Sequence, residues 1–358
     1  MMKDLRSKSF ITSPFHAGSY SREHLRRRVS RMHNVVIAQS LHPQGVQRLV
    51  DGLGSDFAVV DRGNASLPEL LGALETSEFA IGQKFTVEMG RHAPGLRLLH
   101  AQGSGTDDID RRALPPGCYL ANVYEHEVAI AEHVFMLMIS LARDLLALDA
   151  GLRRGDMGPA GHYGGPERME LHGTTLGIVG YGRIGREIAR RAHVFGMRVV
   201  AVKGHPDPEL AERDGLAFLG SSADVSQIAA ESDFLVVCAT LTPETDGLID
   251  AEAIGRMKPT AYLINVGRGR VVAEEPLYRA LRDRKIAGAA IDVWYTYPPV
   301  GQLGQPGHFP FQALSNVIMT PHVAGWTNGT VSRRMAFIVE NIKRVTRGEE
   351  PLNVVARG

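Results

Sequence analysis

One stretch in the second half of the chain constrains the fold more than any other. An apolar run at 176–179 leads into the glycine-rich string GYGRIG at 180–185, a segment of helical periodicity follows, and a second apolar run, MRVVAV, comes at 197–202. Strand, glycine turn, helix and second strand at this spacing predict a βαβ unit. Continuous apolar strands of this kind are typical of a parallel sheet that is covered on both faces.

The same rhythm of short apolar runs and helix-length segments occupies most of the chain. A first set begins at Asn34, and a second set follows the segment 151–173, whose Gly and Pro content predicts an ordered loop. Between Val128 and Leu148 apolar residues become dense at helical spacing, which predicts one long, mostly buried helix that can also supply a dimer contact. The length of 358 residues favours two domains. We therefore expect two α/β domains.

Composition excludes several classes of protein. Forty basic and thirty-nine acidic residues give a net charge of +1, so we expect a small-molecule partner and no nucleic acid. No apolar run approaches the roughly 18 residues of a membrane span, and residues 1–33 lack a signal-peptide core, so we expect a cytoplasmic protein. Cys118 and Cys238 lie in separate apolar runs and predict buried thiols, with neither a disulfide framework nor a metal site. The Arg-rich segment 1–33 is read as a solvated extension.

The glycine-rich string predicts a dinucleotide site because each glycine has a distinct task. Gly180 permits the tight turn, Gly182 lets a pyrophosphate approach the backbone, and Gly185 allows close packing of the helix. The helix N-terminus presents free N–H groups to the phosphates. We assign five residues of the string to the cofactor site: Gly180, Gly182, Arg183, Ile184 and Gly185.

The second strand of this unit ends in a cation. NAD-selective sites place an acidic residue there, against the adenosine ribose hydroxyls, but this chain has Lys203, followed by Gly204 and His205. A cation would suit a 2′-phosphate. The sequence therefore favours NADP over NAD, and the alternative is that Lys203 is simply solvated at a strand tip.

Three further segments, AQGSGTDDID at 101–110, INVGRGRVV at 264–272 and MTPHVAGWT at 319–327, accompany the glycine-rich string. In order and spacing this set resembles the D-isomer-specific 2-hydroxyacid dehydrogenase family, from about Asn34 to the C-terminus. The resemblance implies two Rossmann-like or flavodoxin-like parallel-sheet domains with a cleft between them: a substrate domain (34–122 plus 323–358) and an inserted dinucleotide-binding domain (123–322). It also implies a homodimer and hydride exchange between a nicotinamide cofactor and a 2-keto or 2-hydroxy acid.

By this resemblance Arg268 binds the substrate carboxylate and carbonyl oxygen, and His322 is the general acid and base. A guanidinium can hold two oxygens and stays charged, and an imidazole titrates near neutrality, so both residue types suit the chemistry. Asp292 is assigned to the cofactor site. The glycine-rich turn that would cradle the substrate carboxylate through backbone N–H groups consists of Gly103, Ser104 and Gly105.

The chain departs from the family pattern where a Glu usually hydrogen-bonds the histidine. Aligned on Asp292-Val293, that position holds Tyr297, a neutral phenol that can orient the ring without lending it a full charge. We therefore expect Tyr297 to hydrogen-bond His322, and keto-acid reduction to fade at a lower pH than in members with the Glu. Alternatively, Glu125 or Glu127 supplies the carboxylate, or Glu125 and His126 contact the substrate.

Two other functions remain open at this stage. One is a relative that acts on another small anion, as formate and phosphite dehydrogenases of the same superfamily do, because formate oxidation involves no hydroxyl proton. The other is a dinucleotide-sensing binding protein such as the family's corepressors. The presence of both Arg268 and His322 argues against a pure binding module.

Overall fold

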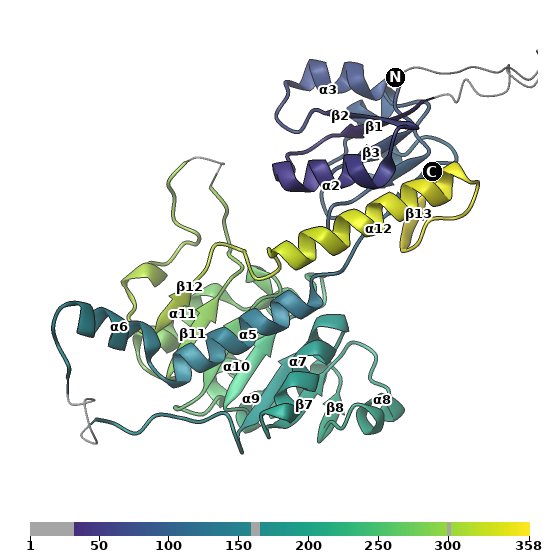
Figure 1. Ribbon diagram of the computed structural model, residues 1–358. Coiled ribbons are helices and arrows are strands. Elements are labelled where there is room, and N and C mark those ends of the chain that lie inside the picture. Colours follow the sequence, from purple (N-terminus) through teal and green to yellow (C-terminus); the bar gives the residue numbers. More distant parts are fainter. Residues whose placement is uncertain (1–31, 159–164, 299–301) are drawn as a thin grey trace, which may run out of the picture. The chain divides into compact units, whose positions relative to one another are not determined.

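The computed structural model describes residues 32–158, 165–298 and 302–358. The chain divides into two compact units: unit 1 comprises the residues up to Ala121 together with Val339–Gly358, and unit 2 comprises Asn122–Ile338. Each unit is built around one sheet, of six strands in unit 1 and seven in unit 2 (Figure 1). The predicted α/β class with two sheets is therefore confirmed. The arginine-rich extension lies, up to residue 31, outside the described residues.

Unit 1 has the strand order β13-β5-β4-β3-β1-β2. Strands β1 to β5 run parallel, and β1 lies between β2 and β3. Its elements in chain order are β1 (His33–Ile37), α2 (Pro43–Leu53), β2 (Phe57–Asp61), α3 (Leu67–Leu74), β3 (Phe79–Ile81), α4 (Val87–Arg91), β4 (Leu98–His100), the 3₁₀ turn η1 (Arg111–Ala113), β5 (Tyr119–Ala121), the last part of α12 (Asn328–Thr346) and β13 (Val354–Arg357).

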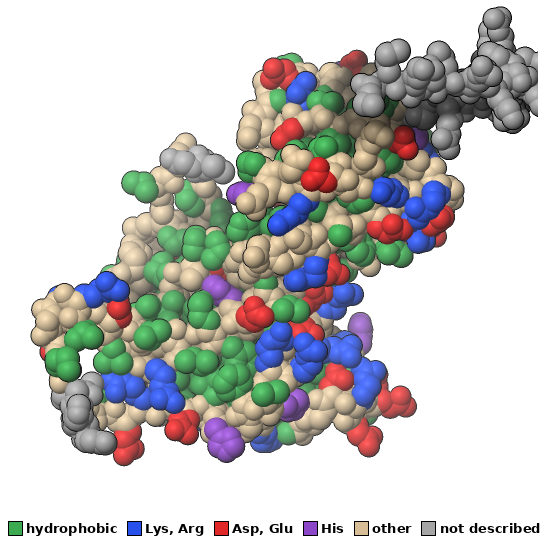
Figure 2. All heavy atoms as spheres, viewed as in Figure 1, with side chains coloured by type: hydrophobic (Ala, Val, Ile, Leu, Met, Phe, Trp, Pro, Cys, Tyr) green, Lys and Arg blue, Asp and Glu red, His purple; other side chains and the backbone are tan. Residues whose placement is uncertain are grey.

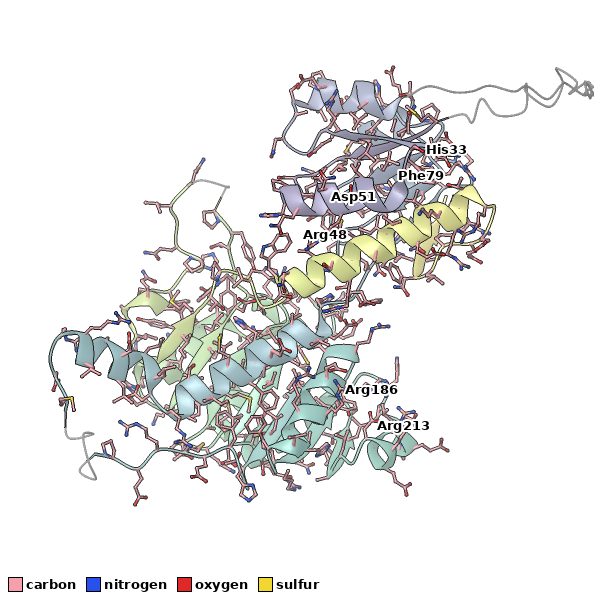
Figure 3. All side chains as sticks on the ribbon, in the orientation of Figure 1. His33, Arg48, Asp51, Phe79, Arg186 and Arg213 are labelled. Carbon is pink, nitrogen blue, oxygen red and sulfur yellow. The ribbon has the colours of Figure 1, made fainter. Side chains whose placement is uncertain are left out.

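The sheet of unit 1 is parallel except at one edge. Its edge strand β13 pairs antiparallel with β5, with an irregularity between Val354 and Ala356. The sequence NVVARG near the C-terminus is short and half-exposed, so its apolar content gave no strand pattern of its own. On the neighbouring strands β1 and β3, the rings of His33 and Phe79 meet edge to face, with their centres 6.1 Å apart (Figure 3).

Unit 2 contains most of the residues assigned to function. Its elements in chain order are α5 (Glu127–Ala142), α6 (Leu145–Arg153), β6 (Thr175–Val179), α7 (Arg183–Val194), β7 (Arg198–Val202), α8 (Pro208–Arg213), β8 (Phe218–Gly220), η2 (Ser222–Asp224), α9 (Val225–Glu231), β9 (Phe234–Val237), α10 (Ala251–Arg256), β10 (Tyr262–Asn265), η3 (Gly269–Val271), α11 (Glu274–Arg282), β11 (Gly288–Ile291), η4 (Phe311–Ala313), β12 (Val317–Met319) and the first part of α12.

The strands of unit 2 are all parallel and follow the order β12-β11-β10-β9-β6-β7-β8. The order reverses between β6 and β9, which makes the carboxyl ends of these two strands a topological switch point. Ligands of open α/β sheets bind in the crevice at such a point. The glycine-rich string at 180–185 follows β6 directly. The fold therefore positions that string where a ligand is expected.

The long helix expected at 128–148 is two helices. Helix α5 ends at Ala142, and Asp144 has a positive φ of 53°, so the chain turns before α6 begins at Leu145. Helix α5 is buried along Ala131, Val134 and Met138, whereas α6 has no buried residue. Periodicity could not show this break, because the apolar spacing continues through it. Helix α6 also extends to Arg153, inside the segment that we read as loop.

The second boundary between the compact units lies inside α12, between Ile338 and Val339. The sequence had placed the return of the chain at residue 323, about one helix earlier. The first boundary lies between Ala121 and Asn122, next to the residue that we expected. The role of each unit in binding cofactor or substrate stays a prediction at this point.

Both cysteines are free thiols, and burial raises the pKa of each to about 12. They therefore stay protonated and unreactive at neutral pH. In the part of the chain that the structure describes, no helix is both long and apolar enough to cross a membrane.

Candidate active site

The turn after β6 requires glycine at two places. Gly180 has φ +99°, and a Cβ there would lie 2.6 Å from the backbone of Ala239, which follows β9. A Cβ on Gly185 would lie 2.8 Å from the carbonyl oxygen of Gly180, so this glycine lets α7 pack against the turn. A Cβ on Gly182, in contrast, would have no atom within 4 Å. The turn is thus tight on the protein side and open at Gly182.

Gly182 is the N-cap of α7, and no side chain caps this helix end. The N–H groups of the first helical turn have no partner within the helix, which suits a pyrophosphate. The side chain of Arg183 is held elsewhere: its Nε donates to Glu127 Oε1 at 2.6 Å, and its guanidinium lies 4.6 Å from the centre of the Tyr124 ring. Arg183 can therefore offer a ligand its backbone more readily than its charge.

Lys203 lies directly after β7, with its N–H donating to the Gly220 carbonyl oxygen at 2.9 Å. It is partly exposed, and the next residues, Gly204 and His205, continue into a bend. This is the position at the end of the second strand where the ribose of a bound dinucleotide is read. Its placement leaves the preference for NADP as a prediction.

The remaining site residues of unit 2 follow three adjacent strands. Arg268 comes shortly after β10, Asp292 directly after β11 and His322 shortly after β12. Because parallel strands end at the same edge of the sheet, these residues share the edge that carries the glycine-rich string at 180–185. Their separation in sequence therefore conceals a common location.

Arg268 has extended backbone and is held by its neighbours. Its Nη1 donates to the Gly267 carbonyl oxygen at 2.9 Å, and Asn265 Nδ2 donates to the carbonyl oxygen of Arg268 at 3.1 Å. Its positive charge contributes to lowering the pKa of both His126 and His322.

The hydrogen bond expected between Tyr297 and His322 is present. Tyr297 Oη lies 3.0 Å from His322 Nδ1, and the same oxygen accepts the backbone N–H of Trp294 at 3.0 Å. Burial is the main cause that raises the pKa of Tyr297, so the phenol is neutral. The contact leaves the other ring nitrogen, Nε2, as the one that can exchange a proton with a ligand.

The pKa of His322 is lowered. His322 is exposed at the surface, but desolvation of its ring by the groups packed beside it is the largest cause. The negative charge of Asp292 opposes this effect, and the positive charge of Arg268 adds to it. His322 also has a positive φ of 58°, which is uncommon for a residue with a side chain. The backbone conformation and the ring environment of this histidine are therefore both imposed by its surroundings.

Asp292 is buried, with 1% of its surface exposed, and its carboxylate binds the chain around His322. Oδ1 accepts the Thr320 hydroxyl at 2.6 Å and the Val323 N–H at 2.9 Å, while Oδ2 accepts the Ala324 N–H at 2.9 Å. The assignment of Asp292 to the cofactor site stays a prediction.

Neither carboxylate considered as a substitute for the family's Glu contacts His322. Glu127 pairs with Arg183, and Glu125 Oε2 lies 3.4 Å from Arg333 Nε. Burial acts to raise the pKa of Glu127, but the hydrogen bond and charge of Arg183 outweigh it, and the pKa is lowered. The hypothesis that one of them completes a dyad is wrong in this structure, because arginines occupy both.

His126 is the second histidine at this edge. It is buried, its Nδ1 lies 2.8 Å from the Tyr124 carbonyl oxygen, and a Cβ on Gly325 would lie 3.4 Å from its own Cβ. Burial is the main cause that lowers its pKa. His126 therefore lies beside the segment that follows His322, and its contact with substrate stays a prediction.

The glycine-rich turn assigned to the substrate belongs to unit 1. Gly103, Ser104 and Gly105 follow β4, and Gln83 Nε2 donates to the Gly105 carbonyl oxygen. Gln83 itself follows β3, so the turn lies at the carboxyl edge of its own sheet. Its role in binding a carboxylate stays a prediction.

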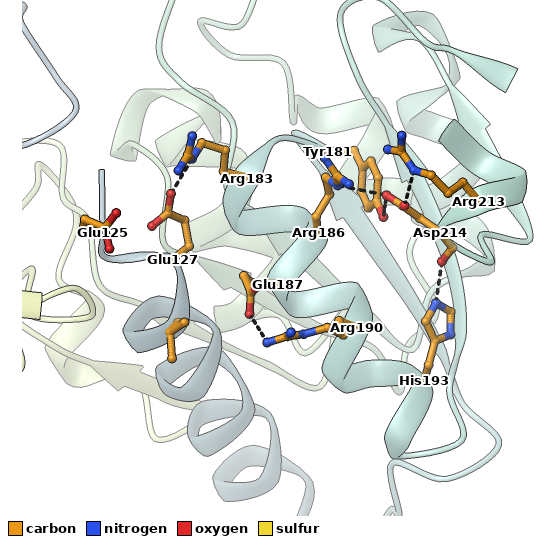
Figure 4. A pocket seen from close by; sticks show the side chains of 11 residues that line it. Glu125, Glu127, Tyr181, Arg183, Arg186, Glu187, Arg190, His193, Arg213 and Asp214 are labelled. Atoms are coloured by element: carbon orange, nitrogen blue, oxygen red, sulfur yellow. Dashed lines mark hydrogen bonds and ion pairs between the residues drawn. The ribbon is translucent and has the colours of Figure 1, made fainter. Parts of the chain in front are cut away.

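A hollow of about 700 Å³ lies in unit 2 between the start of α5, the outer face of α7 and the end of α8 (Figure 4). Its charges are already paired: Arg186 and Arg213 both contact Asp214, and Arg190 contacts Glu187. The Tyr181 hydroxyl, from the glycine-rich string, also donates to Asp214 Oδ2 at 3.0 Å. Its lining does not include Arg268, Tyr297 or His322, so we do not assign the chemistry to it.

Two residues beside Asp292 were not singled out from sequence: His133 and Thr320. Trp294 Nε1 donates to the Thr320 carbonyl oxygen at 2.9 Å, and His133 Nε2 lies 3.4 Å from the Thr320 hydroxyl. Thr320 stands two residues before His322, so proximity in sequence could have suggested it. His133 could not have been found, because it comes from α5. No group of three His, Cys, Asp or Glu side chains among the described residues is arranged to hold a metal.

Comparison with known proteins bears on this site. Residues 135–324 match the NAD binding domain of the D-isomer specific 2-hydroxyacid dehydrogenases. The chain is 33% identical over 282 residues to a glyoxylate reductase of Thermococcus onnurineus, covering 77% of this chain and 81% of the relative. It is 30% identical over 326 residues to a D-3-phosphoglycerate dehydrogenase of Methanocaldococcus jannaschii, and the match spans 90% of this chain but only 59% of that longer protein.

Among solved structures, the chain is similar to an NADPH-dependent glyoxylate/hydroxypyruvate reductase of Sinorhizobium meliloti, determined in complex with NADP and malonate. The TM-score is 0.73 at 25% identity, with 91% of this chain and 97% of the other covered. The match extends over both units described above.

Proposed function

Because this chain belongs to the D-isomer specific 2-hydroxyacid dehydrogenase family, and is thus a nicotinamide-dependent oxidoreductase, we propose that it reduces a short 2-keto acid of the glyoxylate or hydroxypyruvate type. The reverse reaction oxidises the corresponding 2-hydroxy acid. The observation that carries the proposal is the placement of Arg268 and His322 at the sheet edge that bears the glycine-rich string at 180–185. His322 is hydrogen-bonded there to Tyr297.

Binding of the substrate falls to Arg268. Its guanidinium can hold the carboxylate and the keto oxygen of one molecule together, and it stays charged at every working pH. This orients the substrate and polarises the carbonyl that is to be reduced. The N–H groups of Gly103, Ser104 and Gly105, in unit 1, are proposed to bind a substrate carboxylate.

Proton transfer falls to His322. When bound, a reduced nicotinamide supplies the hydride that adds to carbon 2 of the keto acid. His322 Nε2 gives its proton to the keto oxygen, while the Nδ1–H donates to Tyr297 Oη before and after the transfer. The phenol oxygen has lone pairs for both this N–H and that of Trp294, so Tyr297 fixes the ring without changing its own proton.

For the cofactor we propose NADP in preference to NAD. The turn at Gly180–Gly185 and the uncapped start of α7 fit the pyrophosphate shared by both. Lys203, at the end of β7, supports the choice because an ammonium can pair with a 2′-phosphate. The two free thiols, of which Cys118 is buried and Cys238 half-buried, are compatible with action in the reducing cytosol that the sequence predicts.

We also propose that the protein is a homodimer that joins through α5 and α6. Large apolar side chains are exposed there, including Met136, Ile139, Leu146 and Leu152, and Figure 2 shows hydrophobic side chains gathered over this part of unit 2. Helix α6, which has no buried residue, is little stabilised by packing against its own chain, and a second copy would cover it.

Light scattering tests the dimer. It should give twice the monomer mass for the unmodified protein and a lower mass for Leu146→Asp. A monomer at micromolar concentration would exclude the proposal.

A spectrophotometric screen tests the function directly. Glyoxylate, hydroxypyruvate and longer 2-keto acids are offered with NADPH and with NADH, then hydroxy acids with the oxidised cofactors, and formate and phosphite are included. We expect keto-acid reduction that is lost in Arg268→Ala. Oxidation of formate or phosphite alone would identify another small anion as the substrate, and cofactor binding without any turnover would favour a dinucleotide-sensing protein.

A further inference from the structure

Tyr297 reaches His322 from irregular backbone between β11 and η4, and Tyr297 itself is 56% exposed. Backbone of this kind keeps a side chain in place only where other groups hold it. We infer that Glu274, in the first turn of α11, is the positioning residue for Tyr297 and acts through the segment 305–309. This inference rests on the proposed role of His322 as the proton donor.

The Glu274 carboxylate binds the segment 305–309. Its Oε1 accepts the N–H groups of His308 at 2.5 Å and of Phe309 at 3.4 Å, and its Oε2 lies 2.7 Å from His308 Nδ1. The Glu274 side chain is 13% exposed, and a Cβ on Gly307 would collide with Oε1, so the carboxylate and the segment are in close contact. Hydrogen bonds to a carboxylate are about twice as strong as those between neutral groups. Glu274 therefore fixes this segment to the start of α11.

The segment in turn holds the backbone before Tyr297. The Pro306 carbonyl oxygen accepts the N–H groups of Tyr295 at 3.1 Å and of Thr296 at 3.0 Å. The Thr296 hydroxyl donates to the Gln305 carbonyl oxygen at 2.9 Å. Three hydrogen bonds thus join the two residues before Tyr297 to this segment. The position of the phenol therefore depends on where the segment lies.

Aromatic side chains also attach this part of the chain to α11. The Phe309 ring stacks on Tyr278, which lies one turn after Glu274, and the ring centres are 5.2 Å apart. Phe311 lies edge-on to Tyr278, with centres 5.5 Å apart. The hydrophobic contribution of such packing is non-directional, whereas hydrogen bonds are directional. Removal of the carboxylate should therefore displace the segment and leave the protein folded.

A double-mutant cycle in keto-acid reduction tests the connection from Glu274 to Tyr297. Tyr297→Phe removes the hydroxyl that holds the His322 ring and should lower kcat about fivefold, the size of one hydrogen bond. Glu274→Ala should lower kcat by a similar or smaller factor and leave the KM of the keto acid unchanged, because Arg268 keeps its place. The double variant should be no slower than Tyr297→Phe alone, since both changes remove the same interaction. An unchanged kcat in Glu274→Ala, or losses that multiply in the double variant, would overturn the inference.

Glu275→Ala is the matched control. Glu275 is the next residue of α11 and has the same charge, but it is exposed and its Oε1 accepts from Arg279 Nη2 within the helix. This variant should leave kcat nearly unchanged. An equal loss in Glu275→Ala and Glu274→Ala would assign the effect to the charge or the stability of α11, and the inference would fail.

NMR of protein with labelled histidine gives a readout that does not depend on turnover. The Nδ1 resonance of His322, assigned with His322→Gln, reports the hydrogen bond to Tyr297. Glu274→Ala should move this resonance in the same direction as Tyr297→Phe does, and Glu275→Ala should leave it in place. An unmoved resonance in Glu274→Ala would contradict the positioning role. If the unmodified protein reduces no keto acid, the proposed function fails, and this resonance still decides the role of Glu274.

Gly307→Ala takes the place of Glu274→Ala if that variant does not fold. It keeps the carboxylate but sets a methyl group against Glu274 Oε1, so it should disturb the same contact. The Tyr295 ring would lie 3.5 Å from the new Cβ, which is ordinary van der Waals contact. The His322 resonance should therefore shift as it does in Tyr297→Phe. A resonance that stays in place would show that the contact of Glu274 with the segment does not position Tyr297.

Discussion

The turn that follows β6 and the surroundings of His322 lie at the same edge of one sheet, yet they are built differently. The turn consists of consecutive residues from Gly180 to Gly185, and its shape follows from glycine geometry. The histidine site joins a residue from α5, the segment that follows β11 and the segment that follows β12. A site of consecutive residues can be predicted from one sequence motif, whereas a site assembled from distant segments can be predicted only in part from the sequence.

The largest effect is expected at His322. His322→Ala removes the proton donor, so we predict a loss of about 10³-fold in kcat for keto-acid reduction, within the range of general acid catalysis. The Kd of the dinucleotide should not change, because the turn after β6 is untouched. Steady-state rates and fluorescence titration with NADPH measure the two quantities. Equal loss of both would mean that the two regions are not independent.

A matched pair of variants separates two roles of the turn after β6, the backbone conformation at Gly180 and the approach of a ligand at Gly182. Gly180→Ala forces a Cβ toward the Ala239 backbone at a positive φ, and we predict a decrease of about 1–3 kcal/mol in the free energy of unfolding. Gly182→Ala meets nothing within 4 Å and should be as stable as the unmodified protein, but its methyl group obstructs a pyrophosphate. Chemical denaturation and cofactor titration separate the two. If Gly182→Ala bound the dinucleotide normally, the close approach proposed there would be wrong.

A smaller effect is expected at Lys203. Lys203→Asp removes the partner proposed for the 2′-phosphate and offers an acceptor to ribose hydroxyls, so the ratio of NADPH to NADH affinity should fall by roughly tenfold, the size of one charge-assisted hydrogen bond. Lys285→Asp, on an exposed lysine before β11, is the control with the same change in net charge. A similar change of ratio in both variants would assign it to the general field of the protein.

The same contrast explains how much was predictable. The α/β class, the two sets of strands and the turn at Gly180 followed from periodicity and one motif. The break at Asp144 was missed because apolar spacing runs through it, and the antiparallel β13 was missed because a short edge strand has no pattern of its own. Tyr297 was placed beside His322 by alignment with a family, whereas the hydrogen bonds of Asp292 to the chain around His322 depend on where a buried side chain points.

The most direct test of the histidine site is the pH dependence of keto-acid reduction in Tyr297→Glu and in the unmodified enzyme. Reduction requires the protonated imidazole, so its rate falls as the pH rises through the His322 pKa, which burial lowers in the unmodified protein. A carboxylate at position 297 would raise that pKa, and the falling limb should move to higher pH by about one unit or more. Superimposable profiles would show that the group on Nδ1 does not control proton donation, and would contradict the roles given to Tyr297 and His322.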